Sequence, residues 1–169
     1  MTKQLDGNAY WSAAWLTAFE RFTDEKALKR AANQVKKPGY RAQLTDEGIR
    51  FSFSKPRGSC YDGWIRSQID TSEKTWNWFL EDLAARSDLV ASILCGELPA
   101  EVDELLEQYD ISLVPSSPDD FSYGCDCPTG YWGPCTHSLA AVQWMAERIA
   151  RDPFALFEWN GIDLIAELR

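Results

Sequence analysis

Apolar residues recur at helical spacing between residues 10 and 37. Within residues 10–22, aromatic and aliphatic side chains lie three or four positions apart, which predicts a helix that docks an aromatic stripe on a core. Residues 23–37 again have apolar residues three or four positions apart, which predicts a second helix. Thr23 is the predicted N-cap of this second helix, and the two acidic residues that follow it suit the positive end of the helix dipole. Pro38 and Gly39 predict its end.

After residue 39 the apolar period changes to two. Two alternating runs, 40–44 and 49–53, flank an Asp-Glu-Gly turn at 46–48, and a third strand is expected at 61–69. Alternation of this kind is typical of half-buried strands, so the sequence predicts a three-stranded antiparallel meander. The alternating apolar positions are Tyr40, Ala42, Leu44, Ile49, Phe51 and Phe53.

The rest of the chain is predicted to be mainly helical. Residues 71–108 carry three successive helical patterns. The elements expected after them are a short strand at 111–114, a loop at 115–120, and helices at 136–151 and 154–159.

These elements predict an α+β fold. A three-stranded meander with helices forms a body over residues 1–114, and residues 115–169 form a zinc finger that leads into the carboxy-terminal helices. The linking loop is too short to separate independent domains, so we expect the two parts to pack as one unit.

The formal net charge of −9 is unevenly distributed. Residues 1–60 contain eleven Lys/Arg and six Asp/Glu, a net charge of +5, whereas residues 61–169 contain six and twenty, a net charge of −14. Because acidic surfaces repel phosphate backbones, only the amino-terminal third is electrostatically suited to nucleic acid.

Five cysteines, with no apolar leader at the start of the chain, favour a reducing compartment, and we expect a cytoplasmic protein. No run approaches the roughly eighteen apolar residues that a membrane-spanning helix needs, so no membrane partner is expected.

Three cysteines and the only histidine of the chain lie within residues 125–137. Their pattern is C-x-C, seven residues, then C-x-H, and the spacer is rich in glycine and proline, which allows the chain to turn back on itself. Three thiolates and one imidazole match a Cys₃His ligand set for one structural Zn²⁺. The predicted ligands are Cys125, Cys127, Cys135 and His137.

This motif resembles the SWIM-type zinc finger, in which the last C-x-H pair opens a helix. The similarity extends to residues 135–142, which resemble the P-C-K-H-x-A-A-V run of the family with Thr136 in place of the usual Lys. Residues 152–157 resemble the D-P-F-x-L-F stretch of a bacterial subgroup. Further similar segments are 11–19, 96–99 and 111–115.

The resemblance implies a module that binds DNA or protein, and the bacterial subgroup is associated with chromatin-remodelling-type helicases. The family often carries a basic, glycine-rich run where this chain has residues 29–39. These residues keep the positive charge but lack the glycine pattern.

The basic residues of the second helix and of the segment after it are candidates for a nucleic-acid contact face. The alternative is an ordinary solvated helix surface. Tyr131 and Trp132 in the zinc loop either contact a ligand or pack against the metal core. The candidate basic residues are Lys26, Lys29, Arg30, Lys36, Lys37 and Arg41.

A second hypothesis is a protein-interaction subunit that docks on a basic partner through its acidic residues and does not touch nucleic acid. Catalysis is not expected, because His137 is already assigned to the metal and no histidine base remains. The H-x-E and P-C-x-x-C motifs of zinc deaminases are missing, and no small-molecule substrate is evident. Cys60 is expected in a strand and Cys95, like Leu94, in the core.

Overall fold

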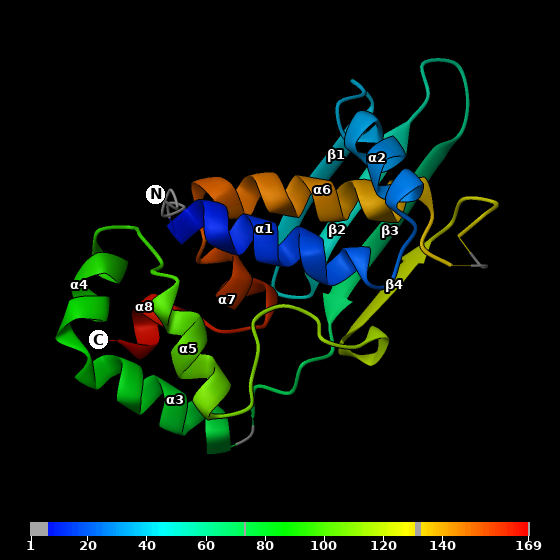
Figure 1. Ribbon diagram of the computed structural model, residues 1–169. Coiled ribbons are helices and arrows are strands. Elements are labelled where there is room, and N and C mark those ends of the chain that lie inside the picture. Colours follow the sequence, from blue (N-terminus) through cyan, green and yellow to red (C-terminus); the bar gives the residue numbers. More distant parts are fainter. Residues whose placement is uncertain (1–6, 73, 131–132, 169) are drawn as a thin grey trace.

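The alternating segments form an antiparallel sheet of four strands in the order β1-β2-β3-β4 in the computed structural model, which describes residues 7–72, 74–130 and 133–168 (Figure 1). The α+β fold class is confirmed, but the meander has one strand more than predicted. The strands are β1 (Tyr40–Thr45), β2 (Gly48–Ser54), β3 (Cys60–Ser67) and β4 (Phe121–Cys125).

The predicted strand at residues 111–114 is wrong. That segment has no strand pairing, and β4 instead begins at Phe121, after a single 3₁₀ turn, η1 (Pro118–Asp120). Phe121, Tyr123 and Cys125 alternate with smaller residues, so the segment presents one side to the core while its backbone pairs with β3.

The predicted helices are present with shifted ends, and α8 is an additional helix that the sequence analysis did not predict. The second helix is capped by Asp24, whose carboxylate accepts a hydrogen bond from the Lys26 amide, whereas the Thr23 hydroxyl donates to the Phe19 carbonyl. The helices are α1 (Gly7–Glu20), α2 (Glu25–Gln34), α3 (Lys74–Ala85), α4 (Ser87–Leu94), α5 (Glu101–Gln108), α6 (Thr136–Arg151), α7 (Ala155–Trp159) and α8 (Leu164–Glu167).

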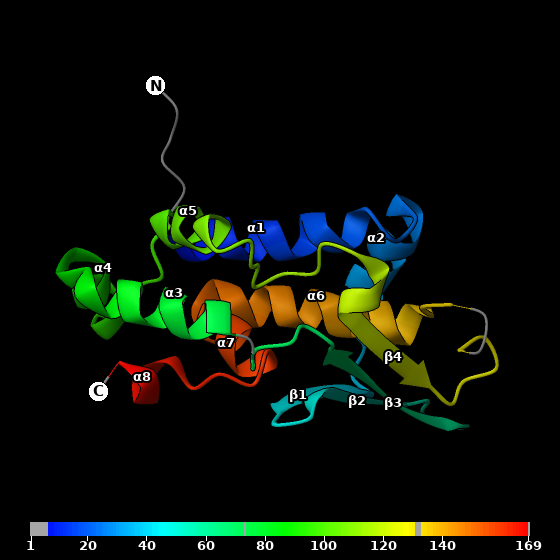
Figure 2. The ribbon, with the colours of Figure 1, turned by 90° about the horizontal axis from the view of Figure 1, so that it is seen from below.

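Helix α6 is the central element of the fold. It packs against β2 and β3 of the sheet on one side, and α1 and α2 cover its other side, so three layers result (Figures 1 and 2). Helices α3, α4, α5 and α8 gather at one end of this stack, and α2 with the β2–β3 hairpin lies at the other (Figure 1). The metal-binding segment is at the end that contains α2.

Leu94 and Cys95 were predicted to lie in the core, and this prediction is wrong. Leu94 is 66% exposed, and the Cys95 thiol is exposed at the C-cap of α4. Leu89 and Ile93 form the buried face of this helix, and a rotation of about 100° per residue places Cys95 on the opposite side.

The aromatic stripe of α1 lies in the core, as predicted. Trp15 is fully buried, its indole N–H donates to the Val142 carbonyl at 2.9 Å, and its ring packs edge-on against Trp159 with centroids 4.8 Å apart. This one side chain therefore joins α1, α6 and α7.

Replacement of Trp15 by Ala should lower the free energy of unfolding by about 3–5 kcal/mol, because it leaves a large cavity between three helices. Trp78→Ala is the matched control, since Trp78 on α3 is 52% exposed and its loss should cost no more than about 0.5 kcal/mol. Urea unfolding of both variants measures the difference, and equal losses would contradict this assignment of the core.

Candidate metal centre

The sheet register places Cys125 on the side of the sheet that faces α6. Cys125 pairs with Gly63, which in turn pairs with Phe51, a buried residue of β2. The pairing continues one residue further, because the Asp126 amide donates to the Asp62 carbonyl at 3.1 Å. The first ligand is thus fixed at the end of a paired strand rather than on a free loop.

A tight turn after β4 brings Cys127 back toward Cys125. The Gly130 amide donates to the Cys127 carbonyl at 3.0 Å, and the Cys127 side chain is buried. A Cβ atom on residue 130 would lie 2.2 Å from the Cys125 carbonyl oxygen, so only glycine fits this close approach of the two backbone segments.

Cys135 is the N-cap of α6. Its sulfur accepts a hydrogen bond from the Ser138 amide at 3.4 Å and lies 3.4 Å from the Ser138 hydroxyl, which is also buried. Exposed amides at a helix start favour negative charge, so this position suits a thiolate. The prediction that the second ligand pair opens a helix is confirmed.

The imidazole of His137 is oriented by the sheet. Phe53 and Tyr61 are direct partners in the β2–β3 register, and each ring lies 5.2 Å from the His137 ring, centroid to centroid. The buried Tyr40 hydroxyl donates to the His137 carbonyl at 2.9 Å. Contacts with the sheet therefore hold both the side chain and the backbone of His137.

The ligand atoms of the four predicted residues all lie within 4.8 Å of one another, and the group could hold a metal ion. His137 faces the sulfurs through Nδ1, which is 3.9 Å from Cys125 Sγ and 3.8 Å from Cys135 Sγ. Tetrahedral bonds of about 2.3 Å to sulfur and 2.0–2.1 Å to nitrogen place such atoms about 3.6 Å apart. The donor set and its spacing thus fit one tetrahedral ion.

The protonation equilibria at this centre differ between the ligands. Burial raises the pKa of the Cys125 thiol. At Cys127 burial acts in the same direction, but hydrogen bonds with the Thr129 hydroxyl and amide and with the side chains of Cys125 and Cys135 together outweigh it and lower the pKa. Burial, followed by the nearby charges of Lys37 and Lys55, lowers the pKa of His137. Its imidazole is therefore held in the neutral form that ligates metals.

The candidate basic residues are not all brought to one place. Arg30 and Lys37 lie beside the metal ligands and line a cavity that also includes Cys127 and His137. Lys26, Lys36 and Arg41 are exposed outside this cavity, and exposed Lys29 forms an ion pair with Glu25 at 2.7 Å. Helix α2 rests on α6 through Leu28 and Ala31, which pack on Leu139 just beyond the metal site.

Lys55 and Gln34 are among the cavity residues that sequence reasoning missed. Lys55, in the β2–β3 hairpin, and Gln34, on the buried side of α2, also line the cavity beside the metal ligands. A lysine in a Pro/Gly loop and a glutamine in a helix carry no local signal of a site, because only the tertiary fold brings them together.

Other predicted features are placed as follows. Tyr131 and Trp132 lie outside the described residues. Cys60 is the first residue of β3, as expected, and is exposed. None of the described helices combines the length and the apolar character that crossing a bilayer demands.

The chain is similar to the uncharacterized protein Rv2102 of Mycobacterium tuberculosis, with 27% identity over 172 residues. The alignment covers 99% of this chain and 61% of the mycobacterial protein, so the chain spans about three fifths of its relative. No family model matches the sequence, and no solved structure matches the chain.

The Gly130→Ala variant should bind metal at least about tenfold more weakly, because its Cβ would force apart the backbone segments that carry Cys125 and Cys127. Titration with Co²⁺, whose thiolate complexes absorb strongly, measures the change. Gly58→Ala is the control, since its Cβ would meet only the Lys55 side chain at 3.5 Å. Unchanged affinity in the Gly130 variant would show that the turn does not position the ligands.

Proposed function

We propose that this protein is a structural-zinc binding module that contacts nucleic acid, or a complex that processes nucleic acid, through the surface around its metal centre. The observation that carries the proposal is that the Cys₃His group shares a cavity with the basic residues Arg30 and Lys37. Zn²⁺ is the natural occupant, because three thiolates and an imidazole in tetrahedral spacing match its preferred ligands better than those of Mg²⁺ or Ca²⁺.

The ligand set favours a structural role over a catalytic one. Four protein ligands fill a tetrahedral site, whereas catalytic zinc keeps a position for water or substrate. Cys125 and Cys127 come from the edge of the sheet, and Cys135 and His137 from the start of α6. A metal bound there joins two layers of the fold, which is what a structural ion does.

Nucleic acid is favoured as the partner by the separation of charge in the molecule. The basic residues of α2 lie at the end of the molecule that carries the metal centre. Residues 74–110, which form α3 to α5 at the other end, contain nine Asp/Glu and two Lys/Arg (Figure 1). A phosphate backbone would be attracted to the first end and repelled by the second.

Assignment to the SWIM type is part of this proposal. It is supported by the order C-x-C, C-x-H and by the position of the last pair, with Cys135 as N-cap and His137 in the first turn of α6. A role beside a helicase of the chromatin-remodelling type is what that assignment would imply.

The alternative partner is a basic protein that docks on the acidic end without any contact to nucleic acid. Exposed carboxylates along α5 favour it, since Glu101, Glu104 and Glu107 face solvent. The two proposals predict different effects of charge reversal. Reversal at the basic end would abolish nucleic-acid binding, and reversal at the acidic end would abolish binding of a basic protein.

The purified chain should contain one equivalent of zinc. Cys127→Ser should lose most of it and unfold at lower urea concentration, because structural zinc contributes directly to folding free energy. Cys60→Ser is the matched control, since Cys60 is exposed and lies outside the group of ligands. Elemental analysis of the three proteins measures this, and full zinc content in the Cys127 variant would contradict the proposed ligand set.

Affinity for a short DNA strand should fall steeply with salt, and Lys26→Glu combined with Lys36→Glu should weaken it at least about tenfold. Lys74→Glu, a single reversal on α3 at the acidic end, should change it much less. Fluorescence anisotropy at several salt concentrations measures these effects. If the strand does not bind and a basic partner is lost on reversal of α5 acids instead, the protein-docking alternative is correct.

A further inference from the structure

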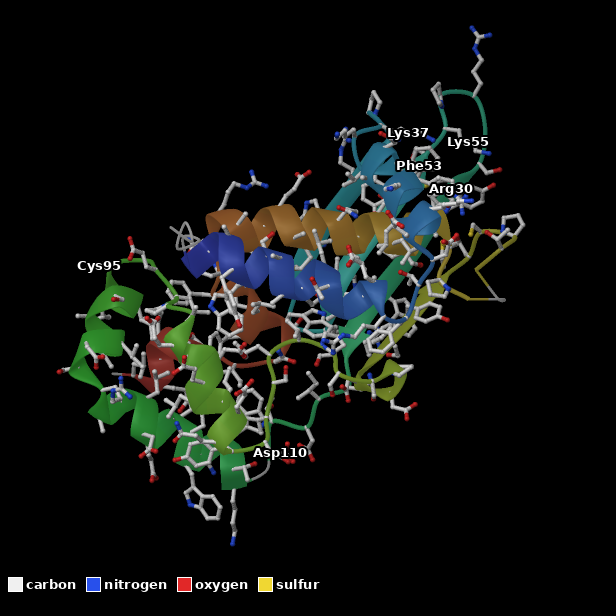
Figure 3. The ribbon with its side chains drawn as sticks, viewed as in Figure 1. Arg30, Lys37, Phe53, Lys55, Cys95 and Asp110 are labelled. Atoms are coloured by element: carbon white, nitrogen blue, oxygen red, sulfur yellow. The ribbon has the colours of Figure 1, made fainter. Side chains whose placement is uncertain are left out.

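A cavity of about 500 Å³ opens between α2, the β2–β3 hairpin and the metal-binding turn. Its walls come from parts of the chain far apart in sequence, and Figure 3 shows Arg30, Lys37, Phe53 and Lys55 together at this end of the molecule. The metal ligands Cys127 and His137 form part of the lining. The cavity is therefore built by the same contacts that assemble the metal centre.

The charge of this cavity is one-sided. Arg30, Lys37 and Lys55 line it, and no carboxylate among the described residues does. Asp126, next to the lining residue Cys127, is exposed, and its carboxylate accepts a hydrogen bond from the Asp62 amide at 2.9 Å. Three thiolates with Zn²⁺ carry a net charge of −1, so the cationic side chains exceed the charge of the metal centre.

Two of the cations are held in place by aromatic rings. The Lys37 ammonium lies 5.6 Å from the centre of the Phe53 ring, and the Lys55 ammonium lies 5.6 Å from the centre of the Tyr61 ring. Both rings also pack on His137. Cation–π contacts of this kind restrict lysine side chains, so less freedom is lost when an anion binds.

A buried donor in the cavity wall has no partner. Gln34 is only 4% exposed, and its Oε1 accepts a hydrogen bond from the Lys37 ammonium at 2.7 Å. This bond fixes Nε2 as the remaining donor, and Nε2 has no hydrogen-bond partner among the described residues. A buried unpaired donor is unfavourable, and here it belongs to a residue that lines the cavity.

We propose that this cavity receives a phosphate group of a bound nucleic-acid strand, an inference that rests on the proposed nucleic-acid role. A phosphate supplies both the negative charge that the three cations require and acceptor oxygens for their N–H groups. A strand is favoured over a small phosphate ester because exposed Lys26 on α2 and Lys36 after it continue the positive charge beyond the cavity. A polymer with one negative charge per nucleotide can occupy the cavity and contact the lysines beyond it at the same time.

The test compares Lys55→Gln with Lys36→Gln in the full zinc-loaded chain. Each change removes one positive charge from an exposed side chain, but only Lys55 lines the cavity. The probe is a fluorescein-labelled single strand of about twelve nucleotides, within the site sizes of single-strand binders. Zinc content and urea unfolding of both variants should equal those of the unmodified protein, which excludes a folding defect.

Lys55→Gln should weaken strand binding at least about tenfold and lower the slope of log affinity against log salt by about 1, whereas Lys36→Gln should weaken it less than about threefold. Inorganic phosphate should displace the strand from the unmodified protein more effectively than chloride at equal ionic strength, and this advantage should disappear in Lys55→Gln.

Equal effects of the two variants, with a strand that binds the unmodified protein, would overturn the cavity assignment and leave the proposed function intact. A strand that does not bind the unmodified zinc-loaded protein would overturn both. The measured affinity of the unmodified protein thus separates the two failures.

Discussion

Four ligand atoms that lie within 4.8 Å of one another connect the end of strand β4 to the first turn of helix α6. The sheet contributes Cys125 by register and holds the His137 ring on a cross-strand aromatic pair, while the helix contributes Cys135 as its cap. Because α6 also supports α1 and α2, the position of this helix relative to the sheet determines the arrangement of all three layers. A metal bound at this junction would therefore stabilise the arrangement of all three layers.

The same junction shapes the surface of the molecule. Helix α2 rests on α6 next to Leu139, two residues after a ligand, and so brings Arg30 and Lys37 beside the metal. The β2–β3 hairpin, whose rings pack on His137, contributes Lys55 to the same cavity. Metal binding and the proposed phosphate recognition therefore depend on one set of packing contacts, and a chain that loses zinc should also lose the cavity.

The sequence predicted what local patterns can encode. Helical and strand periods located α1, α2, α6 and the hairpins, and the spacing of cysteines and histidine located the ligand group. It did not reveal β4, because the strand before the metal motif was predicted at 111–114, although Phe121 and Tyr123 alternate as in a strand. The positions of Gln34 and Lys55 in the cavity could not be predicted, since residues distant in sequence form the rest of its lining. Cys95 was placed inside from its apolar neighbours, but its helix turns it outward.

The central claim is that three cysteine sulfurs and one histidine nitrogen bind a single zinc ion. X-ray absorption spectroscopy at the zinc edge of the purified, untagged chain tests it most directly. The account predicts about three sulfur neighbours at about 2.3 Å and one nitrogen neighbour at about 2.0–2.1 Å. A first shell of oxygen and nitrogen atoms alone, with the three cysteines free or joined in disulfides, would contradict it.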